Sequence, residues 1–152
     1  MRRFGEPVRA GIPYVTRPGV YTIIREGDDV LVTEQARPRL EFQLPGGGID
    51  PGESPLPALH RECLEETGWK IRVLRKLGAF QRFTYMPDYD LWARKVCHIY
   101  LSAPVLEAGP PSEPGHVAVW MPLADAAHLL GNAGDRHFVQ RLAAPGLSAR
   151  RP

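Results

Sequence analysis

The chain has 152 residues, with 19 Lys plus Arg against 17 Asp plus Glu, so its formal net charge is +2. Apolar residues make up 43% and charged residues 24% of the chain, which is typical of a globular domain and excludes a fibrous or broadly disordered protein. The small charge surplus also argues against a general nucleic-acid-binding protein.

The cysteines and the apolar runs indicate where the protein works. Cys63 and Cys97 are the only cysteines, too few for a disulfide framework, so a reduced, cytoplasmic setting is expected. No stretch approaches the roughly 20 apolar residues that span a bilayer, so no membrane association is expected. We expect a single domain over residues 1–152, with about 1–15 and 145–152 flexible.

The first third of the chain predicts a β-hairpin followed by a glycine run. Residues 20–25 have strand character, residues 27–29 form a turn signal, and residues 30–33 form the partner strand. A short apolar stretch at residues 42–44 leads directly into the glycines at 46–48.

A helix with clear boundary signals follows. Ser54 is placed to act as N-cap, Pro55 suits the first helical position, and Gly68 suits the C-terminal end. Leu56, Leu59 and Cys63 recur at three- and four-residue spacing, which predicts a stripe that faces the core.

The remainder alternates between strand and helix signals. Asp135 is the expected N-cap of the last helix. Tight hairpins outnumber long crossovers, which favours a mixed β-sheet sandwiched between helices, an α/β fold. The expected elements are strands at 69–74, 78–85, 95–101 and 116–121, a turn at 87–90, a loop at 104–115, and helices at 123–130 and 135–143.

Three glutamates of the helix at 54–68 share one face. With about 100° per residue, Glu66 lies roughly 40° and Glu65 roughly 60° from Glu62. These like charges repel one another, and Arg61 can relieve Glu65 at i+4 but cannot neutralise all three. A divalent cation would do so, and carboxylate oxygens suit Mg²⁺, with Mn²⁺ as a substitute. A solvated acidic face is the alternative interpretation.

The spacing around these glutamates decides between the two interpretations. Seven residue identities stand in one register: Gly47, Glu53, Arg61, Glu62, Glu65, Glu66 and Gly68. Chance gives this register on the order of 10⁻⁹ per starting position. It resembles the Nudix hydrolase signature GX₅EX₇REUXEEXGU, with U a bulky apolar residue, at every fixed position from Gly47 to Trp69. Cys63 and Trp69 stand where aliphatic residues are more usual.

The resemblance implies the Nudix fold, an α/β/α sandwich, and a metal site. Glu62 and Glu66 would be the principal ligands, with Glu65 as a further or water-mediated ligand and the Gly46 carbonyl as a backbone ligand. Glu53 would pair with Arg61, whose planar guanidinium suits holding a carboxylate in place.

The resemblance also implies the reaction, hydrolysis of the diphosphate linkage in a nucleoside diphosphate joined to another group. Metal ions would activate a water and neutralise phosphate charge. A general base would come from a motif glutamate or from a loop, where Glu113 is the candidate. The expected catalytic residues are Glu53, Arg61, Glu62, Glu65 and Glu113.

Basic and aromatic residues near the predicted sheet are candidates for binding a small nucleotide-type substrate. Solvated arginines and core aromatics are the alternative interpretation for each of them. Phe83, Tyr85 and Trp92 are candidates for stacking on a base. The candidates for clamping phosphate are Arg37, Arg39, Arg82, Arg94 and Lys95, with Tyr85 as a further substrate-binding residue.

Alternatives to this function remain open. A non-catalytic Nudix-fold nucleotide sensor or interaction domain would be expected to lose motif carboxylates, and this chain keeps them. An RNA 5′-end hydrolase would call for a basic groove, which a net charge of +2 supports poorly. Some family members that hydrolyse ADP-ribose carry a proline about 16 residues past the motif, and those that act on dinucleoside polyphosphates carry a tyrosine there. In this chain Tyr85 lies 16 and Pro87 lies 18 residues past Trp69, so the two substrate indications conflict. A homodimer is compatible with the sequence.

Overall fold

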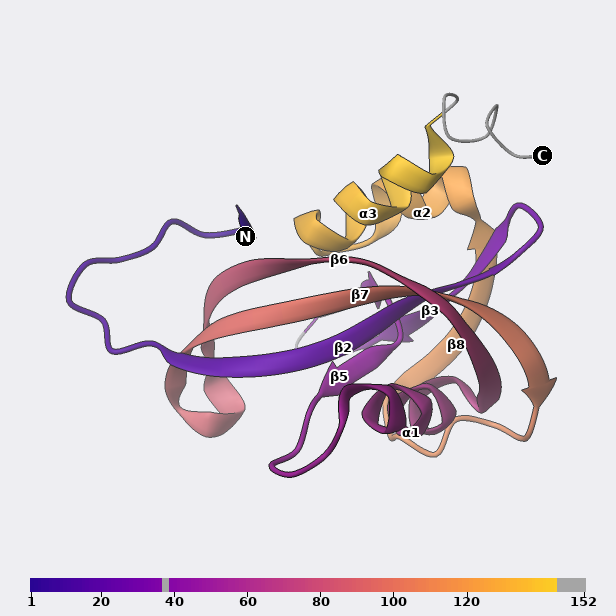
Figure 1. The fold of residues 1–152 in the computed structure, drawn as a ribbon, viewed down its shortest axis with the longest axis horizontal. Helices are drawn as coiled ribbons and strands as arrows, with labels where there is room; N and C mark the ends of the chain where they lie inside the picture. Colours follow the sequence, from indigo (N-terminus) through magenta and orange to yellow (C-terminus); the bar gives the residue numbers. More distant parts are fainter. Residues whose placement is uncertain (37–38, 145–152) are drawn as a thin grey trace.

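A computed structural model describes residues 1–36 and 39–144 of the chain. One mixed sheet carries helices on both of its faces, as the sequence predicted (Figure 1). Helix α1 (Pro55–Thr67) lies against one face, and helices α2 (Leu123–Leu129) and α3 (Ala133–Ala143) lie against the other. Among the described residues, no helix is long and apolar enough to cross a membrane.

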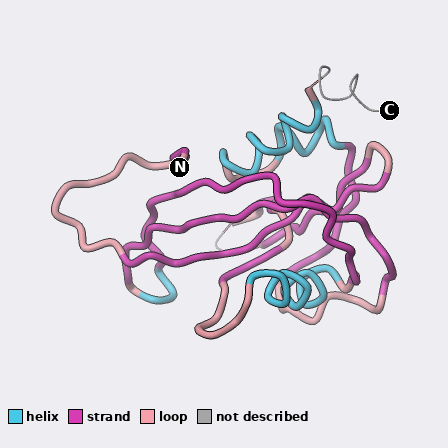
Figure 2. Tube along the Cα trace, viewed as in Figure 1, coloured by secondary structure: helices cyan, strands magenta, loops and turns pink. Residues whose placement is uncertain are grey.

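Within the described residues, the sheet has eight strands in the order β1-β6-β7-β2-β3-β4, with β5 paired to β2 and β8 to β3. Two pairs are parallel, β1 with β6 and β2 with β7, and the others are antiparallel. The long strands β2, β6 and β7 run side by side across the molecule (Figure 2). The strands are β1 (Arg2–Phe4), β2 (Val15–Glu26), β3 (Asp29–Gln35), β4 (Glu41–Gln43), β5 (Gly46–Gly48), β6 (Trp69–Met86), β7 (Leu91–Glu107) and β8 (His116–Pro122).

Several predicted boundaries were wrong. The strands expected at 69–74 and 78–85 are one bulged strand, β6, because β7 pairs with it along its whole length. Strand β7 continues to Glu107, so the loop expected from residue 104 begins later. Strand β1 gave no sequence signal. It is held by pairing with β6 and by the edge-to-face contact of Phe4 with Phe80, whose ring centroids lie 5.6 Å apart.

The residue that caps α3 also differs from the prediction. Asn132 is the N-cap, and its side chain accepts a hydrogen bond of 2.8 Å from the Gly134 N–H. Asp135 is instead inside the helix and only 6% exposed, so its carboxyl group faces the interior.

Two apolar clusters join the helices to the sheet. The larger one packs α2 and α3 against residues such as Ile23, Phe80 and Ile99. The smaller one packs Leu59 and Cys63 of α1 against strands β2, β3 and β6. Leu56, expected to belong to the core-facing stripe, is 43% exposed, whereas Ala58 and Leu59 just after it are fully buried.

Candidate active site

Helix α1 is fixed so that its polar edge faces the strand β5. Ser54 is the N-cap by its backbone conformation, although its side chain makes no capping hydrogen bond. Gly68 takes a left-handed conformation with φ 76° and its N–H donates to the Leu64 carbonyl, which ends the helix. With Leu59 and Cys63 buried, the wheel geometry leaves the glutamates at the edge of the helix, each partly exposed.

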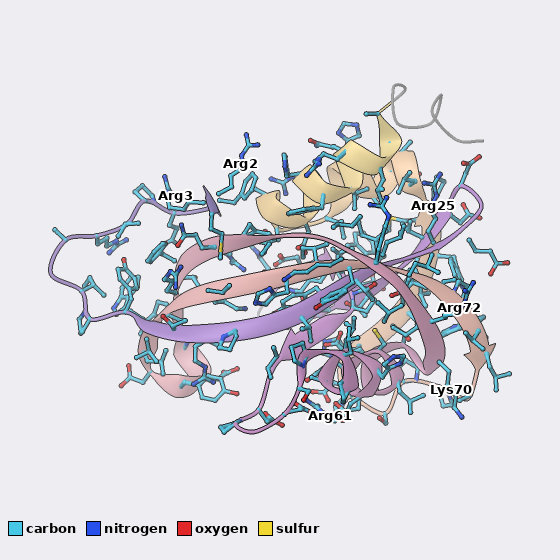
Figure 3. All side chains as sticks on the ribbon, viewed as in Figure 1. Arg2, Arg3, Arg25, Arg61, Lys70 and Arg72 are labelled. Atoms are coloured by element: carbon cyan, nitrogen blue, oxygen red, sulfur yellow. The ribbon has the colours of Figure 1, made fainter. Side chains whose placement is uncertain are left out.

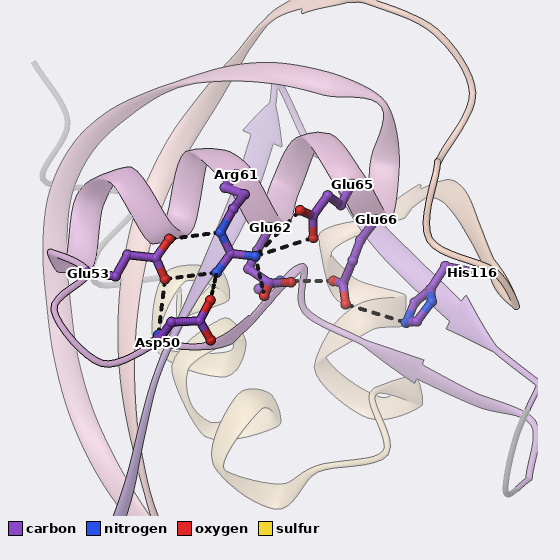
Figure 4. Close-up of polar contacts among 8 residues, drawn as sticks. Asp50, Glu53, Arg61, Glu62, Glu65, Glu66 and His116 are labelled. Carbon is purple, nitrogen blue, oxygen red and sulfur yellow. Dashed lines mark hydrogen bonds and ion pairs between the residues drawn. The ribbon is translucent and has the colours of Figure 1, made fainter.

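Arg61 is the centre of a network of carboxylates (Figure 4). Its guanidinium donates to both oxygens of Glu53, at 2.8 and 2.9 Å, and to Glu62 at 3.1 Å. It also lies 3.4 Å from Glu65 and 3.6 Å from Asp50. Hydrogen bonding to Arg61 lowers the pKa of Glu53 to about 2, and the same contact raises the pKa of Arg61. Both groups are therefore charged at neutral pH.

Glu66 has different partners and a different environment. Its Oε1 accepts a hydrogen bond of 3.0 Å from the Gly46 N–H, and its Oε2 lies 3.4 Å from His116 Nε2 (Figure 4). Its side chain is 13% exposed. Burial, reinforced by the charges of Glu62, Glu113 and Glu65, raises the pKa of Glu66 to about 8. Without a further cation, a charged Glu66 is destabilised here.

Strand β5 can lie close to the Glu62 carboxyl group because its residues are glycines, which have no side chain. A Cβ on Gly47 would lie 2.5 Å from the Glu62 carboxyl carbon, and a Cβ on Gly46 would lie 2.1 Å from the Val20 carbonyl oxygen. Burial, ahead of the repulsion from Glu65, raises the pKa of Glu62. The glycine run therefore brings the β5 backbone against the carboxylates of α1.

Glu113 reaches this site from the loop before β8. The backbone N–H groups of Ser112 and Glu113 both donate to the Glu65 carbonyl, at 2.9 Å each. This bond pair holds the loop on the C-terminal end of α1. The charge of Glu113 raises the pKa of Glu62 and of Glu66, so the three carboxyl groups share one electrostatic environment.

The donor chemistry of this site fits a hard divalent cation. Within the described part of the chain, no three His, Cys, Asp or Glu side chains converge closely enough to form a complete metal cage. Arg61 draws Glu62 and Glu65 to one side, while Gly46 and His116 hold Glu66 on the other. Burial is the main cause that raises the pKa of Glu62 and of Glu66, and a bound cation would offset it by stabilising the charged carboxylates.

A cleft of about 680 Å³ adjoins the carboxylates. Glu53 and Glu62 line one part of it, and Lys95 and Tyr89 line another. A second hollow of about 440 Å³ shares Met86, Tyr89 and Lys95 with the first. Because these residues line both hollows, the two hollows adjoin, and we refer to them together as the cleft.

The predicted substrate-binding residues are not all brought together. Arg82, Arg39 and Tyr85 line the second hollow, although the Tyr85 hydroxyl is engaged with Asp90 and Arg39 lies 3.7 Å from Glu41. Arg94 donates to Gln81 at 2.9 Å and lines neither hollow. Arg37 lies outside the described residues.

Phe83 and Trp92, candidates for base stacking, pack on other aromatic rings. Their ring centroids lie 4.8 and 6.3 Å from that of Tyr14, and neither side chain lines the cleft. The prediction that they stack on a base is therefore not favoured by their positions.

Sequence reasoning missed residues that lie far along the chain from the motif. His116 lies 3.4 Å from Glu66 because β8 passes beside α1. Arg17 and Tyr89 line the cleft, and the Arg17 guanidinium lies 4.7 Å from the centroid of the Tyr89 ring. No local pattern marks these residues, since their positions depend on strand register.

The fold is thus a mixed sheet between helices, in which the acidic edge of α1 faces the glycine strand β5. The family model of the NUDIX domain matches residues 15–142. The chain therefore belongs to the Nudix hydrolase family.

Individual relatives resemble parts of the chain. It is 32% identical over 124 residues to a CMP-5′-(N-acetyl-N-hydroxy-3-aminopropyl)phosphonate hydrolase from Streptomyces rubellomurinus (strain ATCC 31215), covering 77% of this chain and 57% of that one. It is 47% identical over 57 residues to an RNA pyrophosphohydrolase from Helicobacter pylori (strain G27), covering 34% and 37% of the two chains. The chain spans 57% or less of the length of these curated relatives.

A solved structure shares the fold over nearly the whole chain. The MutT protein from Methanosarcina mazei Go1 superposes with a TM-score of 0.69 and 21% sequence identity, covering 93% of this chain and all of that one (100%). At this identity the likeness shows the fold alone.

Proposed function

We propose that the protein is a divalent-metal-dependent pyrophosphohydrolase that cleaves the diphosphate linkage of a nucleoside diphosphate joined to another group. The observation that carries the proposal is the cluster of Glu62, Glu65 and Glu66 on one edge of α1, beside a cleft large enough for a nucleotide. Family membership supports the same reaction class.

The proposed metal ligands are the oxygens that lie between α1 and β5. Glu62 and Glu66 would be the principal ligands, with the Gly46 carbonyl and Glu65 completing the set. Mg²⁺ is the expected ion, with Mn²⁺ as a substitute, because all these donors are hard oxygens. When bound, the ion would supply charge neutralisation on the phosphates and a more acidic water.

The other motif residues position these ligands. Arg61 holds Glu53 by two hydrogen bonds and contacts Glu62, so it fixes the orientation of the carboxylate edge. Glu113 is the proposed general base, because its loop is anchored on Glu65 and its side chain remains exposed to solvent. A proton taken from water by Glu113 would pass directly to bulk solvent.

A sensor that binds nucleotides without turnover is less well supported. Such a domain has no need of a buried, electrostatically strained carboxylate, and Glu66 is one. The bidentate contact between Arg61 and Glu53 is also intact.

A product assay tests the proposal. Nucleoside triphosphates, ADP-ribose, nucleotide sugars, dinucleoside polyphosphates and a short 5′-triphosphate RNA are incubated with the protein in Mg²⁺, in Mn²⁺ and in EDTA. We expect metal-dependent release of a nucleoside monophosphate, or of pyrophosphate, from at least one of them. No turnover of any compound with either metal would refute the proposal.

A further inference from the structure

Three basic residues lie directly opposite one another on three adjacent strands. Lys95 of β7 is in register with Arg82 of β6 on one side and with Arg17 of β2 on the other. Residues opposite one another in register point to the same face of a sheet, and like charges in such pairs destabilise the sheet. We call Arg17, Lys95 and Arg82 the cationic row.

The row crosses the floor of the cleft. Arg17 lines the hollow that contains Glu62, Arg82 lines the adjoining hollow, and Lys95 lines both. A third, small hollow of about 60 Å³ is lined by Lys95 and Arg82 together with Asp135. The row therefore begins beside the carboxylates of α1 and ends in a part of the cleft that Glu62 does not reach.

The row is poorly neutralised. Within residues 1–36 and 39–144, none of the three side chains makes a hydrogen bond or an ion pair, and the Arg17 guanidinium lies over the ring of Tyr89. Burial, and the neighbouring charges of Arg82 and Arg17, lower the pKa of Lys95. Arg61, by contrast, has a carboxylate partner in Glu53 at 2.8 Å.

The acidic residues near the cationic row compensate only part of its positive charge. Glu41, which also lines the second hollow, is paired with Arg39 at 3.7 Å. Burial raises the pKa of Asp135 to about 7, so a large fraction of this carboxyl group is protonated at neutral pH. Asp88 lies on the exposed turn after β6. The row thus retains a surplus of positive charge inside a cleft, where screening by solvent is reduced.

We propose that the cationic row binds a phosphate group on the half of the substrate that lies beyond the scissile diphosphate. This inference builds on the proposed function and specifies its substrate class: a diphosphate in which the second half carries a further phosphate. The row extends, through Lys95 and Arg82, along the second hollow, which none of the proposed carboxylate ligands of the metal lines. Its three cations would then serve an additional anionic group, since guanidinium and ammonium groups are the usual phosphate partners.

Binding without turnover tests the row directly. Adenosine 2′,5′-bisphosphate, adenosine 3′,5′-bisphosphate and AMP are titrated by calorimetry into the parent and into Lys95→Gln, Arg82→Gln and Arg72→Gln in metal-free buffer. Arg72 is exposed and lies near the start of β6, away from the cleft, which makes it a matched control for the loss of one charge (Figure 3).

We expect the parent to bind at least one bisphosphate roughly tenfold or more tightly than AMP, as charged hydrogen bonds of this kind allow. Lys95→Gln and Arg82→Gln should each abolish this preference, and Arg72→Gln should keep it. Lys95→Gln should be at least as stable as the parent, because it removes repulsion within the row. Equal affinity of AMP and both bisphosphates for the parent would overturn the proposal.

Hydrolysis separates this inference from the proposed function. NADPH and NADH differ by one phosphate, and their kcat/KM values are compared for the parent and Lys95→Gln in Mg²⁺. A preference for NADPH that disappears in Lys95→Gln supports the proposed role of the row. An equal loss of kcat/KM on both compounds shows instead that the row acts on the scissile diphosphate, and it overturns the inference. If the protein prefers a bisphosphate but hydrolyses none of the tested compounds, the proposed enzymatic function is refuted and the phosphate-binding role of the cationic row stands.

Discussion

Arg61 holds Glu53 by two nearly parallel hydrogen bonds, from Nε to Oε2 at 2.8 Å and from Nη2 to Oε1 at 2.9 Å. The two residues are separated by eight positions and belong to different elements, the loop before α1 and the helix itself. The remaining nitrogen of the guanidinium points to Glu62 and Glu65. One side chain therefore connects the loop after the glycine strand with the proposed metal ligands.

Replacement of Arg61 by lysine should weaken Mg²⁺ binding strongly and change the folding stability of the protein little. Lysine keeps the charge but cannot make the bidentate contact, so Glu53 and Glu62 lose their fixed orientation. We expect roughly a 10- to 100-fold rise in the Mg²⁺ concentration that gives half-maximal turnover. A Mg²⁺ titration of initial rates measures this, with Arg72→Lys as the control. An unchanged Mg²⁺ dependence would contradict the positioning role of Arg61.

Glu66→Gln should separate activity from folding. Glutamine can still accept the hydrogen bond from the Gly46 N–H, and it removes a buried charge whose pKa is raised to about 8. We expect turnover to fall by more than about 100-fold while the Tm in metal-free buffer at pH 8 stays equal or rises. Initial rates and thermal unfolding of the same preparation check both. Equal turnover by the variant and the parent would remove Glu66 from the proposed metal site.

Adjacent glycines provide a steric test of the same site. A Cβ at Gly47 would meet the Glu62 carboxyl group at 2.5 Å, whereas a Cβ at Gly48 would meet nothing within 4 Å. Gly47→Ala must therefore displace the Glu62 side chain, and we expect a loss of activity similar to that of a missing ligand. Gly48→Ala should retain parental kcat/KM. Similar rates for the two variants would show that the position of Glu62 is unimportant.

Local signals in the sequence were enough to predict the elements that hold the motif. The N-cap at Ser54, the end at Gly68 and the burial of Leu59 and Cys63 depend on residues within one helix, and the structure confirms them. Leu56 follows the same periodicity but is exposed, because periodicity does not tell where the sheet beneath a helix ends.

Contacts between distant segments could not be predicted in this way. The approach of His116 to Glu66 and the register of Arg17, Lys95 and Arg82 are set by the pairing of β2, β6, β7 and β8. A one-residue shift in any of these strands would turn the same side chains to the opposite face. A single sequence without strand register therefore gives the motif but not the rest of the cleft.

Asp135 should make the stability of the fold decrease as the pH rises. Its folded pKa is raised to about 7 by burial, from an ordinary value near 3.8, so the folded protein holds a proton that the unfolded chain releases. The stabilisation is fully present below about pH 4 and is lost as the pH rises to about 7.

The Asp135→Asn variant isolates this contribution. Asparagine stays neutral at all these pH values and can still accept the hydrogen bond from the Leu44 backbone that the carboxyl group accepts. We therefore expect the variant to gain stability relative to the parent between pH 4 and pH 7, at about 1.4 kcal/mol for each unit of pKa shift. Urea unfolding of both proteins at several pH values in this range measures the difference. Parallel stability curves would show that Asp135 is charged inside the folded protein, which requires a counter-charge from Lys95 or Arg82.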